Sequence, residues 1–145
     1  MDIQNPKSKI FRCFVIAPFD NFRLKDAIKR SLNEISVEVI TADEFSSSSS
    51  IVNNIIQTIE NSDFVIADIT RKNPNVMYEI GFAHALRKPT LIITDKENKE
   101  PLPTNLSGWL YIIYDQNNFR SLQTSIVRSI SNIISKQRNE GANNE

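Results

Sequence analysis

The sequence contains only one cysteine, Cys13, and one histidine, His84. Two such residues cannot supply the three or four nitrogen and sulfur ligands of a structural zinc site, and one cysteine cannot form an intrachain disulfide. Cys13 lies in an apolar run and is expected to be a buried packing residue. The composition therefore excludes zinc-dependent and disulfide-stapled folds, and no metal site is expected.

Glycine is also scarce, because Gly81, Gly108 and Gly141 are the only three among 145 residues. Glycine-rich phosphate loops need closely spaced glycines, which let the backbone turn tightly and approach the phosphates. The sequence therefore contains neither a dinucleotide-binding fingerprint nor a Walker loop. No bound cofactor is expected.

Long apolar runs and an excess of one charge are absent as well. No run reaches the roughly 20 residues needed to span a bilayer, and the polar segment 1–9 does not resemble a signal peptide. Lysine and arginine total 17, as do aspartate and glutamate, so the formal net charge is zero. An extended basic surface for nucleic acid or a polybasic membrane anchor is therefore not expected. These features favour a cytoplasmic protein with neither nucleic acid nor a membrane as partner.

Short apolar runs alternate along the chain with stretches of helical periodicity. The runs are rich in β-branched and aromatic residues and predict strands, whereas apolar residues at intervals of three and four predict helices. The predicted strands cover residues 11–17, 37–40, 64–69, 90–94 and 111–114, and the predicted helices cover 22–35, 51–59, 74–86 and 119–134.

Strands that alternate with helices require right-handed crossovers, which make the strands parallel and place helices on both faces of the sheet. We therefore predict one flavodoxin-like or Rossmann-like α/β domain over residues 1–136, with a mostly parallel sheet of about five strands. The pattern leaves the strand order open. Residues 137–145 are polar and are expected to form a frayed tail.

In sheets of this kind, ligands bind at the carboxyl ends of the strands, near the switch in strand order. Asp68 either contacts a ribose hydroxyl or caps the chain at the end of its strand. Arg71 is either a phosphate ligand or a solvated charge. The candidate ligand-binding residues in the loops at this edge, and at the start of the helix after the third strand, are Pro18, Phe19, Asp20, Asp43, Asp68, Arg71, Asn73 and Asn75.

Glu79 is the candidate catalytic residue. Asn73 followed by Pro74 predicts a helix start, with a side-chain cap and proline at the first helical position. Glu79 then falls in the second turn, above the carboxyl edge of the sheet. His84 lies about 140° around the same helix, so it is not expected to act with Glu79. From these residues alone, Glu79 is either a functional carboxylate or a solvated one.

Residues 62–94 read SDFVIADITRKNPNVMYEIGFAHALRKPTLIIT. The blocks I-A-D-I-T, N-P-N-V-x-Y-E-I-G-x-A-H-A-L and K-P with its apolar strand resemble the nucleoside 2-deoxyribosyltransferase superfamily. The first strand, C-F-V-I-A-P-F, and the later L-P-T-N-L and Y-I-I-Y-D resemble a bacterial branch often described as TIR-like. The resemblance covers about residues 11–115.

This resemblance implies cleavage of an N-glycosidic bond in a nucleoside, a nucleotide or NAD. In such enzymes the glutamate of the E-[LI]-G motif, here Glu79, attacks the anomeric carbon and forms a glycosyl-enzyme intermediate. Water then completes hydrolysis, whereas a second base completes transfer. Relatives of this type are often homo-oligomers, so a homo-oligomer is expected.

The sequence departs from the family pattern at two positions. Family members usually carry an acid, which handles the leaving base, on the helix before the S-D-F-V-I-A-D strand. The corresponding position here is close to Ile55. The family also places serine or aspartate six residues before the glutamate, where this chain has Asn73. A departing purine must gain a proton or strong hydrogen bonds, so these departures leave the substrate class open.

Four functions are compatible with these observations. The first is nucleoside 2-deoxyribosyltransferase-like cleavage or transfer. The second is TIR-like NAD hydrolysis or ADP-ribosyl cyclisation. The third is a nucleotide-binding sensor that has kept the cleft without the reaction. The fourth, which these observations favour least, is an interaction module that assembles through its sheet edge or its helices.

Overall fold

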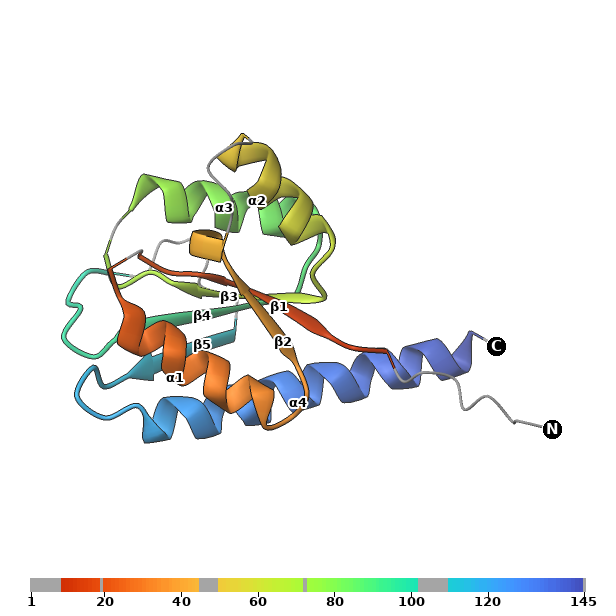
Figure 1. The fold of residues 1–145 in the computed structure, drawn as a ribbon. Coiled ribbons are helices and arrows are strands. Elements are labelled where there is room, and N and C mark those ends of the chain that lie inside the picture. The colour runs from red at the N-terminus through yellow and green to blue at the C-terminus, as the bar shows by residue number, and fades with distance from the viewer. Residues whose placement is uncertain (1–8, 19, 45–49, 72, 102–109, 145) are drawn as a thin grey trace.

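The computed structural model describes residues 9–18, 20–44, 50–71, 73–101 and 110–144. Strands and helices alternate along the described chain as far as residue 95, as the sequence predicts (Figure 1). In chain order they are β1 (Arg12–Ile16), α1 (Phe22–Asn33), β2 (Glu38–Thr41), the short 3₁₀ helix η1 (Ala42–Glu44), α2 (Ile51–Glu60), β3 (Phe64–Asp68), α3 (Pro74–Ala85), β4 (Thr90–Asp95), β5 (Leu110–Tyr114) and α4 (Arg120–Asn143).

The five described strands form one parallel sheet in the order β2-β1-β3-β4-β5. The chain moves outward from β1 to β2, returns to pair β3 with β1, and then moves outward in the opposite direction. This is the flavodoxin-like order, so the predicted fold class is confirmed. Its switch point lies between the carboxyl ends of β1 and β3, where α/β sheets bind their ligands.

Helices cover both faces of the sheet, with α1 and α4 on one face and α2 and α3 on the other (Figure 1). Neighbouring residues of β1 point to opposite layers, so Cys13 packs in the α1–α4 layer and Phe14 in the α2–α3 layer. Every residue of β3 is buried. A strand covered on both faces has no solvent-facing positions, which explains why these strands read as continuous apolar runs. Cys13 is fully buried, as predicted, and burial raises the pKa of its thiol.

The start of α3 matches the cap predicted from the sequence. The Asn73 side chain accepts a hydrogen bond of 2.9 Å from the backbone N–H of Asn75, and Pro74 occupies the first turn. The side chain satisfies a backbone donor that the helix leaves unpaired, and proline supplies a preset φ angle. These two residues therefore set where α3 begins, and with it the height of Glu79 above the sheet.

Two helix ends differ from the sequence expectations by more than one residue. The first helix ends at Asn33 rather than Ile35, because the chain reverses at Ser36, which has a φ angle of 58°. The last helix continues to Asn143, through most of the segment expected to form a frayed tail. Four buried side chains anchor its first four turns, and extending an existing helix costs little compared with starting one. The anchoring residues are Leu122, Ile126, Ile130 and Ile134.

Substitution of Leu122 tests the packing of α4 against the sheet. We expect Leu122→Ala to lower the free energy of unfolding by roughly 2–5 kcal/mol, because the side chain is buried and its removal leaves a cavity. Arg128→Ala, at an exposed position of the same helix, is the control and should change stability little. Urea unfolding followed by circular dichroism measures both. Equal effects of the two substitutions would contradict the packing described.

Candidate active site

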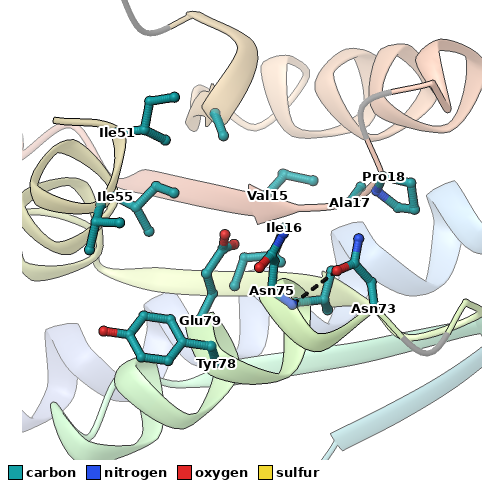
Figure 2. A pocket seen from close by; sticks show the side chains of 13 residues that line it. Val15, Ile16, Ala17, Pro18, Ile51, Ile55, Asn73, Asn75, Tyr78 and Glu79 are labelled. Carbon is teal, nitrogen blue, oxygen red and sulfur yellow. Dashed lines mark hydrogen bonds between the residues drawn. The ribbon is translucent and has the colours of Figure 1, made fainter. Parts of the chain in front are cut away.

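A cavity of about 260 Å³ opens beside the carboxyl end of β1, between β1, α2 and α3 (Figure 2). It adjoins the switch point of the sheet, where a ligand site is expected. Its volume lies near the lower end of the range for small-ligand sites, roughly 300 Å³. The lining residues are Val15, Ile16, Ala17 and Pro18 from β1 and the residues after it, Ala42 from η1, Ile51, Val52 and Ile55 from α2, and Asn73, Asn75, Val76, Tyr78 and Glu79 from α3 and its cap.

The cavity has one polar side and one apolar side. Asn75 and Glu79 are four residues apart on α3, so their side chains share one helix face. Ile51 and Ile55 bear the same relation on α2. Figure 2 shows the Glu79 carboxylate pointing into the space below Ile55, with the Asn75 amide beside it. A ligand in this space would meet hydrogen-bonding groups from α3 and hydrocarbon from α2.

The Glu79 carboxyl group is the titratable group most altered by this environment. Burial raises its pKa from 4.5 to about 7, because the surrounding apolar groups disfavour the charged form. Among the residues that the structure describes, none donates a hydrogen bond to this carboxylate or pairs with it. A desolvated carboxylate whose oxygens lack partners and whose pKa is close to neutrality is typical of a functional site.

Asp68 ends β3 outside the cavity lining and belongs to a buried hydrogen-bond network. One carboxylate oxygen accepts bonds from the Thr70 backbone N–H at 3.0 Å and from the Thr70 hydroxyl at 2.6 Å. The other accepts a bond of 3.1 Å from the Tyr114 hydroxyl. The backbone N–H of Asp95 donates to the Thr70 hydroxyl oxygen at 2.8 Å. The network therefore joins the ends of β3, β4 and β5 and fixes the first residues of the loop that leads to α3.

Two further candidate residues pair with each other next to the cavity lining. The Arg71 guanidinium donates to the Asp20 carboxylate at 2.8 Å, and this bond holds the pKa of Asp20 below its usual range. Asp20 lies two residues after Pro18, and Arg71 two residues before Asn73, both of which line the cavity. The exposed pair therefore connects the loop after β1 with the loop before α3.

The predicted site residues divide into three groups. Pro18, Asn73, Asn75 and Glu79 line the cavity, so the structure brings these four together. Phe19 lies outside the described residues. The remaining four predicted residues are outside the lining, and among them Asp43 pairs with Lys25 at 3.6 Å. His84 is exposed and does not line the cavity, as its position around the helix predicts.

Sequence reasoning missed the apolar wall formed by α2. The sequence predicts only that Ile51, Val52 and Ile55 lie on one face of the helix over residues 51–59. The structure leaves Ile51 and Val52 more than half exposed and places all three at the cavity. Apolar side chains on a helix give the same periodic signal whether they cover a core or line a pocket. Only the position of α2 beside the switch point distinguishes the two.

The described parts of the chain contain neither a metal-binding cluster nor a membrane-spanning helix. These residues contain no cluster of three or more histidine, cysteine, aspartate or glutamate side chains arranged to hold a metal ion. None of the helices placed in the structure is long and apolar enough to cross a membrane.

Comparison with known proteins identifies a family and a shared fold. The family model for nucleoside 2-deoxyribosyltransferase matches residues 14–127 of this chain. A search of curated proteins gave no significant match.

Three solved structures are similar to this one. A 2-deoxyribosyltransferase from Bacillus psychrosaccharolyticus is 16% identical, with a TM-score of 0.58 over 77% of this chain and 90% of its own. A CMP N-glycosidase from Clostridium botulinum is 22% identical, with a TM-score of 0.56 over 83% of this chain and 98% of its own. The TIR domain of a Toll-related receptor from Hydra magnipapillata is 16% identical, with a TM-score of 0.64 over 86% and 98%. At these identities the likeness shows a common fold.

The stability of a Glu79→Gln variant tests the burial of the carboxylate. At about pH 8 we expect the variant to be more stable than the wild type by roughly 1–3 kcal/mol, because the wild type must desolvate an ionised group. The folded pKa, about 7, exceeds the ordinary value of 4.5. The gain should therefore be absent below pH 4.5, increase between pH 4.5 and 7, and stay constant above pH 7. Urea unfolding across this pH range measures the gain in stability, and a gain that does not depend on pH would contradict the raised pKa of Glu79.

The Tyr114 hydroxyl tests the network around Asp68. We expect Tyr114→Phe to lower the free energy of unfolding by roughly 1–3 kcal/mol, because a buried carboxylate loses one hydrogen bond. Tyr111→Phe on the same strand is the matched control, since Tyr111 is exposed and should tolerate the change. Thermal or urea unfolding compares the two variants, and equal stability would show that the Tyr114 bond contributes nothing.

Proposed function

Because the chain belongs to the nucleoside 2-deoxyribosyltransferase family, we propose that it cleaves the N-glycosidic bond of a nucleoside or nucleotide with Glu79 as nucleophile. The observation that carries the proposal is the Glu79 carboxylate, which points into the cavity at the switch point of the sheet. The names of two of the similar structures, a 2-deoxyribosyltransferase and a CMP N-glycosidase, are consistent with this chemistry.

The reaction follows from the position of the carboxylate. One Glu79 oxygen donates an electron pair to the anomeric carbon, and the base leaves with the electrons of the C–N bond. The resulting ester between sugar and Glu79 is then attacked by water, which releases the free sugar, or by a second base, which forms a new nucleoside. The first step requires the ionised carboxylate. Exclusion of water by the apolar lining strengthens its interaction with the positive charge that develops on the sugar.

Asn75 is the residue that we assign to binding the sugar. Its amide lies beside the Glu79 carboxylate in Figure 2 and offers both donors and an acceptor to hydroxyl groups. Asn73 lines the same side of the cavity, although its oxygen is already bonded to the Asn75 backbone. We assign the polar side of the cavity to the sugar for this reason. A homo-oligomeric state and a cytoplasmic location stay predictions from the sequence.

Release of free base measures the proposed activity. A panel of deoxynucleosides, deoxynucleoside monophosphates, ribonucleotides and NAD is incubated with the protein, and the products are separated by chromatography. We expect release from one substrate class and a loss of about 100-fold or more in Glu79→Gln, because the neutral amide cannot attack the anomeric carbon. Glu60→Gln, at an exposed position outside the cavity lining, is the matched control. Full activity in Glu79→Gln would refute the assigned role.

The pH dependence of the same reaction supplies an independent check. Since the reactive form is the ionised carboxylate, kcat/KM should rise with pH and reach half its maximum near pH 7. A fall over this range would indicate that Glu79 acts as an acid instead. If folded protein released no base from any member of the panel, calorimetric titration with the same compounds would test the remaining alternative. Binding of an unchanged nucleotide would then identify a sensor module.

A further inference from the structure

The side of the cavity that faces Glu79 is formed by hydrocarbon. Figure 2 shows Ile55 across the space from the Glu79 carboxylate, with Ile51 one turn earlier on α2. Val52 and Ala42 also contribute to the lining. All the polar side chains that line the described cavity, Asn73, Asn75, Tyr78 and Glu79, belong to α3 or its cap.

This division orients a bound nucleoside, if the proposed function holds. The sugar hydroxyls require hydrogen bonds and lie against α3, so the base lies against the isoleucines of α2. Such a wall offers contact and desolvation but neither a proton donor nor an acceptor. Among the lining residues that the structure describes, Glu79 is the only carboxylic acid, and none is a histidine. Within the described lining, the base therefore leaves toward a wall that offers no acidic side chain to protonate it.

The charge on the base then decides how readily the bond breaks. When the C–N bond breaks, its electron pair stays on the base nitrogen. A neutral purine or pyrimidine leaves as an anion unless an acid supplies a proton, and an anion against isoleucine is strongly disfavoured. A base that is already cationic, such as a pyridinium or a 7-alkylated purine, accepts the electron pair and leaves neutral. No proton transfer is then needed.

We propose that the cavity selects nucleosides or nucleotides whose base is cationic before cleavage, and that Ile55 is the residue that sets this preference. The ionised Glu79 supports it, since it is the one formally charged side chain among the described lining residues and attracts a cationic ligand. The inference rests on the proposed function and specifies its substrate class.

A matched pair of substrates tests the preference. The two substrates are 7-methylguanosine and guanosine, each in the sugar and phosphate form that is active in the panel. For each substrate, the rate of cleavage by the protein is divided by the rate of uncatalysed cleavage. We expect the wild-type protein to accelerate cleavage of the cationic member at least about 100-fold more than cleavage of the neutral one. A general acid would contribute about this factor to cleavage of the neutral member, and the described lining supplies none. Equal acceleration of both, lost in Glu79→Gln, would overturn this inference while supporting the proposed function. Cleavage of guanosine alone would also overturn the inference, whereas the proposed function fails only if no member of the panel releases its base.

Substitution of Ile55 tests whether this residue sets the preference. Ile55→Glu places an acid across from Glu79 and should raise cleavage of guanosine relative to 7-methylguanosine by about tenfold or more. Ile55→Gln, with a side chain of the same length that cannot donate an acidic proton, is the matched control and should leave the ratio unchanged. Circular dichroism verifies that both variants fold. An unchanged ratio in folded Ile55→Glu would show that Ile55 does not set the preference, and the wild-type comparison decides the substrate class even if a variant fails to fold.

Discussion

The buried Asp68 carboxylate is the interaction on which the geometry of the site depends. Its hydrogen bonds to Thr70 and Tyr114 tie the carboxyl ends of β3 and β5 together, and the Thr70 hydroxyl extends the connection to β4. The loop that leaves this network reaches Asn73 within five residues and begins α3 there. A buried carboxylate is costly unless its oxygens are bonded, so the network resists rearrangement. The position of Glu79 is consequently set by the start of α3, which is held by the Asp68 network before the loop and by the Asn73 cap after it.

The strands were predictable from the sequence because both faces of the sheet are buried, which produces apolar runs such as residues 64–68. The polar half of the site was predictable because Asn73 and Pro74 mark the helix start that places Asn75 and Glu79. The order of the strands was not predictable, since several orders satisfy the same alternation of strands and helices. The α2 wall was missed because Ile55 has the periodicity of a core residue. The helical continuation of α4 was also missed, since a polar segment can extend an anchored helix.

The apolar side of the cavity accounts for the altered carboxylate on its polar side. Hydrocarbon around Glu79 raises its pKa to about 7, so a fraction of the carboxylate stays ionised at neutral pH but poorly solvated. That state costs folding stability and increases the attraction between the carboxylate and a positively charged sugar. In the proposed reaction, the same hydrocarbon, presented by Ile55, faces the departing base. The proposal thus derives both the reactivity at the sugar and the selection of the leaving group from one arrangement of α2 and α3.

Mass spectrometry of the protein, after the reaction has been quenched during turnover, tests the central claim most directly. If Glu79 attacks the anomeric carbon, the protein gains one glycosyl group, and digestion places it on the peptide that contains Glu79. The Glu79→Gln variant treated in the same way should gain no mass. A glycosyl group found on another residue, or base release by the variant at the wild-type rate, would contradict the role assigned to Glu79.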